Sequence, residues 1–264
     1  MRRQRPRPNK PASQARRGKP RHARQSADSD RVMLFGLHAV EAALANPNRP
    51  VVRLLATENA AHRLGAVLAK RGLTPEPASP RDLDRLLGPD AVHQGVALET
   101  EPLPPAELDE VSPDGILLVL DQVTDPQNVG AALRSAAAFG AAGLVLTERH
   151  SPPLQGVLAK AASGALDIVP VILVKNLAQA LAELGERGFM RVGLAEEETE
   201  ALEAMKLTRP LALVLGAEGK GLRQLTREHC DALCRISTQS AFASLNVSNA
   251  AAVALHWASL KTKG

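Results

Sequence analysis

Residues 116–147, ILLVLDQVTDPQNVGAALRSAAAFGAAGLVLT, contain the clearest structural signal in the chain. An apolar run at 116–120 leads through a polar loop into a helix-like stretch at 126–139, and a second apolar run follows at 143–146. Short continuous apolar runs separated by helices are typical of parallel strands that are buried on both faces of a sheet. This stretch therefore predicts a strand–helix–strand unit of an α/β domain.

The same alternation continues to residue 264. Further strands are expected at 168–174, 190–194, 211–215 and 233–236. Helices are expected at 154–163, 177–187, 222–229 and 247–260. We therefore predict that residues 116–264 form one α/β domain around a parallel sheet.

Residues 31–101 predict a second, smaller α/β unit. Its expected strands lie at 51–55 and 95–98, and its expected helices lie around Val40 and at 61–70 and 81–87. Residues 102–115 contain four prolines and a closing Asp-Gly, which is typical of a linker between domains. The chain is therefore expected to have two domains.

The positive charge of the chain is concentrated at its N-terminus. The formal net charge is +4, yet residues 1–24 hold ten Lys or Arg and no acid, so the remainder is net negative. Residues 1–30 are polar, rich in proline and almost free of large apolar side chains, which predicts a disordered basic tail. Two interpretations remain open: an arm that binds phosphates, and a segment that only aids solubility.

Composition excludes several classes of protein. No apolar run approaches the roughly 18 residues of a membrane helix, and no apolar segment follows the basic N-terminus as in a secretory signal. With two cysteines, one Trp, four Phe and no Tyr, neither a disulfide framework nor base stacking on aromatic side chains is expected to dominate. Cys230, Cys234 and His229 lack a second pair of metal ligands, so we expect buried cysteines instead. These features predict a cytoplasmic protein with no metal and no membrane segment.

The loop after the strand at 116–120 carries polar side chains beyond its structural needs. Its sequence is DQVTDPQNVG at 121–130, in which Asp125 and Pro126 suit the start of a helix. Capping does not require Asn128 or the later Arg134. Because ligands bind at the carboxyl ends of strands in open α/β sheets, we expect both side chains to face a site.

Two further loops follow predicted strands. The loop at 215–221, LGAEGKG, is rich in glycine, yet it lacks the Ser or Thr of a Walker A loop and the spacing of a dinucleotide fingerprint. Its Glu218 would repel phosphates and suits an adenosine ribose or a structural role. At 244–249, SLNVSN, either Ser244 or Asn246 can cap the next helix, and the other polar side chains are left for function.

Together, the motifs DxxxDPxNxGaxxR, LGaEGkG and SLNVSnA resemble those of the SpoU group of SPOUT RNA 2′-O-methyltransferases. The N-terminal unit is similar to the substrate-binding domain of the large-subunit rRNA members at 36–41 (GLHAVE) and 93–96 (HQGV). The resemblance implies an α/β fold with a C-terminal parallel-sheet SPOUT domain that contains a trefoil knot. A small L30e-like α/β substrate-binding domain would precede it.

The resemblance also implies ligands and site residues. S-adenosylmethionine would bind in the knot, against backbone near Gly216, Ile236 and Leu245. The catalytic positions carried over from the family are Asn128, Arg134, Glu218, Ser244 and Asn246. Family members dimerise with both subunits shaping each site, so we expect a homodimer whose partner is large-subunit rRNA.

The implied reaction is methyl transfer to the ribose 2′-hydroxyl of a guanosine in the peptidyl-transferase region of 23S rRNA. A sulfonium methyl is already electrophilic, so the hydroxyl has only to lie in line and lose its proton, without a metal. Arg134 is the family's proposed base, but the pKa of arginine, above about 12, favours contact with the adjacent phosphate. Two alternatives are a tRNA ribose methyltransferase, which the N-terminal domain disfavours, and a non-catalytic ribosome-assembly protein, which the five intact site positions disfavour.

Overall fold

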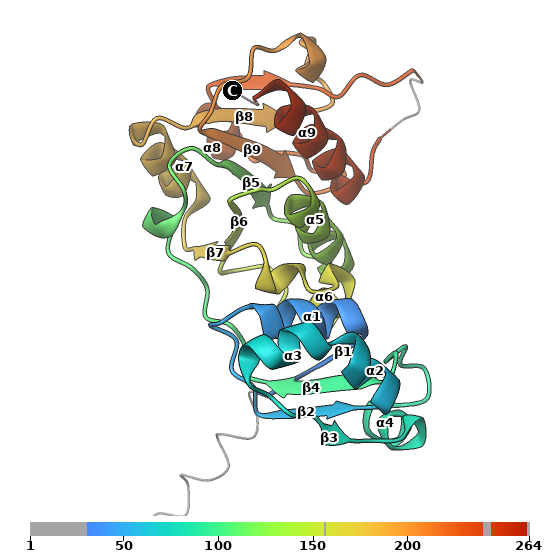
Figure 1. Ribbon diagram of the computed structural model, residues 1–264. Coiled ribbons are helices and arrows are strands. Elements are labelled where there is room, and N and C mark those ends of the chain that lie inside the picture. The colour runs from blue at the N-terminus through green and yellow to red at the C-terminus, as the bar shows by residue number, and fades with distance from the viewer. Residues whose placement is uncertain (1–30, 156, 240–243, 263–264) are drawn as a thin grey trace, which may run out of the picture.

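The computed structural model describes residues 31–155, 157–239 and 244–262. The predicted basic tail, residues 1–30, lies outside the described residues. Figure 1 shows two stacked parts, each built on its own sheet, with the N-terminal part below the C-terminal part. Within the described ranges, no helix is both long and apolar enough to cross a membrane.

The N-terminal sheet has four strands in the order β1–β4–β2–β3. Their bounds are Val32–Phe35 for β1, Arg53–Ala56 for β2, Glu76–Pro77 for β3 and Val96–Thr100 for β4. Strand β4 pairs antiparallel with β1 and β2, and β2 pairs parallel with β3. The sequence did not predict β1 or β3, because four and two residues are too few to establish a period.

The helices of this part are α1 (Leu37–Ala45), α2 (Glu58–Arg63), α3 (Gly65–Arg71) and α4 (Pro80–Leu87). The single helix predicted at 61–70 is wrong. Helix α2 begins earlier because the hydroxyl of Thr57 accepts a hydrogen bond from the backbone N–H of Ala60. It ends at Leu64, and Gly65, a poor helix former, begins α3.

The C-terminal sheet has six parallel strands in the order β10–β8–β9–β5–β6–β7. The bounds are Ile116–Asp121 for β5, Gly143–Thr147 for β6, Val171–Val174 for β7, Met190–Leu194 for β8, Leu211–Gly216 for β9 and Ala232–Cys234 for β10. The predicted parallel α/β sheet is confirmed. Strand β7 begins three residues later than predicted, because Ala165–Asp167 forms a 3₁₀ turn before it.

Helices cover both faces of the sheet (Figure 1). Helices α5 (Pro126–Ala138), α6 (Val157–Ala162) and α9 (Val247–Lys261) pack on one face, and α7 (Leu177–Glu186) and α8 (Gln224–Glu228) lie on the other. Alternate residues of β5 pack against the helices on the two faces of the sheet. Leu118 packs with α5 and α9, and Leu117 packs with α7. This double burial explains why β5 has no polar alternation.

Residues 102–115 pack against the C-terminal sheet. Ala106 bridges Ile172 of β7, and Leu108, in the 3₁₀ turn Leu108–Glu110, is buried. The guanidinium of Arg187 donates to the backbone oxygens of Leu108 and Val111, at 2.5 and 3.1 Å. The segment that joins the two sheets is therefore held against the C-terminal sheet from Ala106 to Val111.

A buried ion pair joins the two parts of the molecule where α1 lies beside α6 (Figure 1). The guanidinium of Arg49 donates to both carboxylate oxygens of Asp167, at 2.7 and 3.0 Å, and the two side chains are 3% and 1% exposed. Asn46 adds a bond to the same carboxylate at 3.2 Å. A Cβ added at Gly164 would lie 2.9 Å from the Cβ of Ala42, so the glycine permits close contact with α1.

The predicted trefoil knot stays a prediction.

Candidate active site

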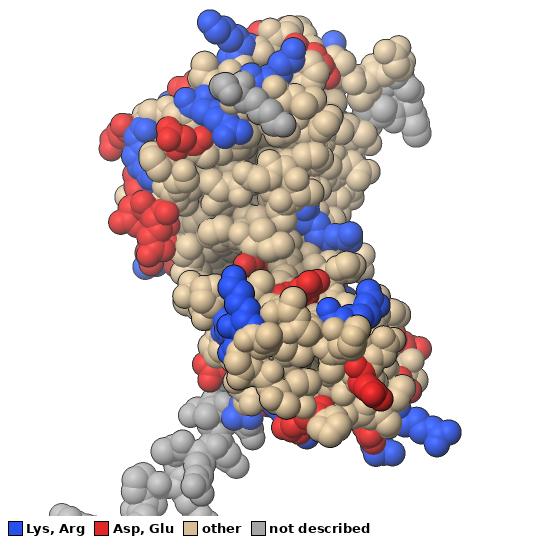
Figure 2. All heavy atoms as spheres, viewed as in Figure 1, with Lys and Arg blue, Asp and Glu red and all other residues tan. Residues whose placement is uncertain are grey.

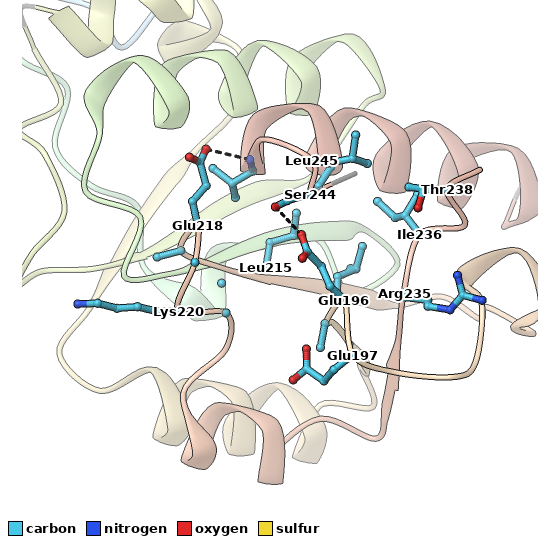
Figure 3. Close-up of a pocket in the computed structure, with 18 residues that line it drawn as sticks. Glu196, Glu197, Leu215, Glu218, Lys220, Arg235, Ile236, Thr238, Ser244 and Leu245 are labelled. Atoms are coloured by element: carbon cyan, nitrogen blue, oxygen red, sulfur yellow. Dashed lines mark hydrogen bonds between the residues drawn. The ribbon is translucent and has the colours of Figure 1, made fainter. Parts of the chain in front are cut away.

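A cavity of about 810 Å³ opens where β8, β9 and β10 end (Figure 3). Its walls come from four segments: the end of β8, the loop after β9, the chain after β10, and the start of α9. Gly216, Ile236 and Leu245, the predicted cofactor contacts, all line it, as do Glu218 and Ser244. The cavity lies at the carboxyl edge of a parallel sheet, the usual ligand position in such folds.

The glycines of the 216–221 loop shape one wall. A Cβ added at Gly216 would lie 2.1 Å from the carbonyl carbon of Gly221, because the loop folds back on its own start. Gly219 and Gly221 have φ values of +74° and +63°, which favour glycine. The glycines of this loop were expected to let the backbone approach a ligand closely. In the structure, Gly216 instead lets the loop pack closely against its own far end at Gly221. Lys220 extends away from the carboxylates of Glu196 and Glu197 (Figure 3).

Asp121 anchors the far end of this loop. Its carboxylate is fully buried at the end of β5 and accepts hydrogen bonds from the backbone N–H and Nε of Arg223, at 3.1 and 2.7 Å. It also accepts a hydrogen bond from the hydroxyl of Thr226 at 2.7 Å. Sequence reasoning did not single out this role, although a carboxylate that ends an all-apolar strand was a signal for it.

Three of the five predicted catalytic residues form one hydrogen-bonded cluster. The Oε1 atom of Glu218 accepts bonds from the amides of Asn246 and Asn128, at 2.7 and 3.2 Å. Asn246 also donates to Oδ1 of Asn128 at 2.9 Å. The backbone N–H of Val247, the first residue of α9, completes the environment of the carboxylate at 3.3 Å. The three motifs therefore meet where α5, the glycine loop and α9 begin.

Asn246 has a second, structural role in the same place. Its Oδ1 atom accepts a hydrogen bond from the backbone N–H of Ser248 at 2.9 Å and so caps α9. The sequence left open which residue caps this helix, and the structure assigns the cap to Asn246.

Ser244 and Arg134 lie apart from the cluster. The hydroxyl of Ser244 donates to Oε1 of Glu196 at 2.8 Å, and both residues line the cavity (Figure 3). Arg134 is exposed on α5 and is absent from the cavity wall, and within the described residues its guanidinium has no hydrogen-bond partner. The structure thus leaves this cation available to a ligand.

A family model described as the SpoU rRNA Methylase family matches residues 115–256. The chain belongs to the SpoU rRNA methylase family. A second model, described as RNA 2′-O ribose methyltransferase substrate binding, matches residues 33–106. The two matches cover the two parts of the fold.

Curated relatives of this SpoU chain cover nearly the same length. A protein of Ralstonia nicotianae named 23S rRNA (guanosine-2′-O-)-methyltransferase RlmB is 42% identical over 233 residues, which cover 84% of this chain and 93% of the relative. The protein of the same name from Pectobacterium atrosepticum is 41% identical, with 84% and 95% coverage. The solved SpoU methyltransferase AviRb of Streptomyces viridochromogenes, in complex with the cofactor AdoMet, is 24% identical with a TM-score of 0.73, over 89% of this chain and 91% of AviRb. This likeness shows a shared fold.

Two carboxylates of the SpoU cavity were missed by the sequence reasoning. Glu196 and Glu197 follow β8 and line the cavity beside the glycine loop. A hydrogen bond with its own backbone, together with the guanidinium of Arg227, lowers the pKa of the Glu197 carboxyl, so it is ionised at neutral pH. An acidic run at the carboxyl end of a strand was a usable signal, but the sequence does not state that β8 lies next to β9.

The cysteines of this SpoU protein are poorly suited to chemistry. Burial raises the pKa of the Cys230 and Cys234 thiols to about 12, so both stay protonated near neutral pH. Cys234 is fully buried as predicted, and Cys230 is half-buried with its thiol on the backbone oxygen of Thr226. Among the described residues, no group of three or more His, Cys, Asp or Glu could hold a metal ion.

Proposed function

We propose that this protein transfers a methyl group from S-adenosylmethionine to the ribose 2′-hydroxyl of a guanosine in 23S rRNA. The observation that carries the proposal is the meeting of Asn128, Glu218 and Asn246 beside the cavity, in a chain about 40% identical to enzymes named for this reaction. The match of residues 33–106 to a substrate-binding model supports rRNA as the partner.

The cavity suits the proposed cofactor in size and in its apolar lining. Its volume of about 810 Å³ lies within the range of small-molecule sites, roughly 300–1,000 Å³. Leu215, Ile236 and Leu245 give apolar surface for an adenine. The carboxylate of Glu196 would lie near a ligand that carries sulfonium and ammonium groups. Glu197 is paired with Arg227, and Lys220 and Arg235 also line the cavity. When bound, the cofactor supplies an electrophilic methyl group.

The chain's own side chains would bind and orient the ribose. The hydroxyl of Ser244 donates a hydrogen bond to Glu196, so its oxygen remains able to accept one from the 2′-hydroxyl. Asn128 is held in place by Glu218 and Asn246 and would fix the same hydroxyl. Arg134 would contact the adjacent phosphate and lower the cost of forming the alkoxide. These roles stay proposals.

A labelling experiment tests the function. The full-length protein is incubated with methyl-labelled S-adenosylmethionine and either unmodified 23S rRNA or tRNA, and the modified nucleotide is mapped. We expect 2′-O-methylguanosine in 23S rRNA, and Asn128→Ala as a control with little incorporation. Label in tRNA only would favour a tRNA methyltransferase, and label in neither RNA would favour a non-catalytic RNA-binding protein.

We also propose that the protein acts as a homodimer through α9. This helix exposes Val253 and Leu260, at 43% and 51%, and their spacing of seven residues puts them on one face of the helix. Arg134 lies outside the cavity wall of its own chain, which suits a site completed by a second subunit. Sedimentation should give twice the chain mass of 27.9 kDa, and Val253→Arg should shift it toward the monomer. A wild-type monomer at micromolar concentration would contradict this arrangement.

The fit of the glycine loop gives a first mutational prediction. Gly216→Val should weaken binding of S-adenosylmethionine by about 5- to 150-fold, because the added side chain displaces the loop from Gly221 at a cost of roughly 1–3 kcal/mol. Isothermal titration calorimetry measures the change. Gly65→Ala is the matched control, since nothing lies within 4 Å of its added Cβ. Equal affinity in the Gly216→Val variant and the wild type would contradict a cofactor site at this wall.

The basic tail gives a second prediction. Deleting residues 1–30 should weaken RNA binding and flatten its dependence on salt, because ten Lys or Arg leave with the tail, while cofactor affinity stays the same. Filter binding at several salt concentrations measures RNA affinity and its salt dependence. If the truncated protein binds RNA at low salt as tightly as the full-length protein, the tail does not bind RNA and only aids solubility.

A further inference from the structure

A second cavity, of about 240 Å³, lies where the two parts of the molecule meet. The N-terminal part contributes residues 33–36 of β1 and the turn after it, two residues of α1, and Val92 and Gln94 before β4. The C-terminal part contributes Ala159, Lys160 and Ser163, from α6 and the turn that follows it. The junction cavity therefore exists only when the two parts are docked.

The docking that creates the junction cavity is firmly held. The Arg49–Asp167 pair is almost fully buried, and Gly164 lies directly against α1. Ala159, which lines the cavity, is also part of the buried core of the N-terminal sheet. The lining residues from the two parts thus keep a fixed spacing, which a binding site requires.

The lining has the chemistry of a site for an anionic, partly apolar ligand. Phe35, Ala39 and Val92 give an apolar surface, and Val92 is 73% exposed. Lys160 is the sole charged residue among the lining residues, in a chain whose net charge beyond residue 24 is negative. Figure 2 shows Lys and Arg side chains on both sides of the waist between the two parts, with Asp and Glu side chains among them.

Several polar groups of the lining are available to a ligand. Gln94 uses Oε1 to accept a hydrogen bond from the backbone N–H of Leu37 at 2.8 Å, which orients its amide nitrogen. Within the described residues, neither this nitrogen, the His38 ring, the Lys160 ammonium nor the Ser163 hydroxyl has a hydrogen-bond partner. Gln94 and Ser163 also have φ values of +52° and +49°, a conformation that non-glycine residues rarely adopt.

We propose that the junction cavity binds one unpaired nucleotide of the RNA substrate, with the base against the apolar surface and its phosphate at Lys160. A cavity of about 240 Å³ is below the roughly 300–1,000 Å³ of drug-sized sites, which suits a single flat base. Proteins read RNA sequence mainly from unstacked bases in loops and bulges, through their polar edges. The amide of Gln94 and the ring of His38 would read that edge.

The position of α6 links the junction cavity to the active site. Helix α6 packs on α5 at Gly130, where an added Cβ would lie 2.6 Å from the Cβ of Ala161. Arg134 lies one turn further on the same face of α5. An RNA whose phosphate contacts Arg134 would therefore pass along the α5–α6 side toward Lys160. The nucleotide in the cavity would set which ribose reaches the site, so this inference rests on the proposed function.

Binding and kinetics of charge variants test the proposal with the full-length protein and a 23S rRNA fragment that the wild type methylates. Lys160→Glu and Gln94→Glu should each raise the Kd for RNA and the KM by about tenfold, with kcat and cofactor affinity near wild type. Lys160→Arg should restore binding. Lys206→Glu is the matched control, because this exposed lysine lies before β9, at the amino end of the strand.

A scan of abasic nucleotides identifies the occupant. At one unpaired position of the RNA, removing the base should raise the Kd for the wild type by about tenfold. The same abasic RNA should bind the Gln94→Glu variant about as tightly as the intact RNA does. If no position shows this coupling, or if both variants bind RNA like the Lys206→Glu control, the junction cavity is not a nucleotide site. Because the fragment is chosen as one that the wild type methylates, loss of this coupling overturns the nucleotide site alone and leaves the proposed function intact. If the wild type methylates no 23S rRNA fragment at all, the proposed function and this inference both fail.

Discussion

Replacing Arg134 with Ala is expected to lower kcat/KM for rRNA methylation by about 100- to 1,000-fold, the usual cost of losing one group that stabilises developing charge. The guanidinium is exposed and has no hydrogen-bond partner within the described residues, so its removal should leave the fold and the cofactor cavity unchanged. Single-turnover methylation of the rRNA, with the cofactor Kd measured in parallel, separates these effects.

The Arg134→Lys variant distinguishes two roles for this residue. Lysine keeps the charge but cannot form the paired, planar hydrogen bonds of a guanidinium with a phosphate. If Arg134 binds the phosphate, the lysine variant should lose most of its activity, and the pH–rate profile should stay unchanged. If Arg134 is the base, the midpoint of the pH–rate profile should shift to lower pH in the lysine variant, because lysine loses its proton more readily than arginine. Near-full activity in the lysine enzyme would contradict both roles.

The C-terminal strands could be predicted from sequence because their burial is extreme. Every residue of β5 is buried, and its apolar side chains serve two layers, so the run contains no polar residue before Asp121. The strands of the N-terminal sheet gave weaker signals: β1 spans four residues and β3 spans two. Such short strands are defined by their neighbours in the sheet, which a local pattern does not contain.

Some residues of the active site could likewise be predicted from the sequence, and others could not. The resemblance to the SpoU motifs pointed to Asn128, Glu218 and Asn246, and the structure brings the three side chains within hydrogen-bond distance. From the residues alone, only Asn128 stood out as a polar side chain that helix capping does not require. Glu196 could not be found in this way. Its contact with Ser244 spans 48 residues and depends on the order β10–β8–β9, which the sequence does not give.

The buried pair between Arg49 and Asp167 is a further feature that no local pattern reveals, since the partners lie 118 residues apart. Asp167→Ala should lower the free energy of unfolding by about 3–5 kcal/mol, because the Arg49 guanidinium would be left buried without its counter-charge. Urea unfolding followed by far-UV circular dichroism measures this loss.

The double variant Arg49→Met/Asp167→Leu is the control for this prediction. It removes both charges and replaces them with apolar side chains, so it should recover most of the lost stability. If the double variant is as unstable as Asp167→Ala, altered packing and not an uncompensated charge is responsible for the loss.

Losing the pair should also separate the two parts of the molecule. The chain's one Trp, Trp257, lies in α9, so its fluorescence reports the C-terminal part, while circular dichroism reports both parts. In the wild type, the two signals should change together as urea rises, because docking couples the two sheets. In Asp167→Ala they should change at different urea concentrations, and coincident transitions would show that the junction does not depend on this carboxylate.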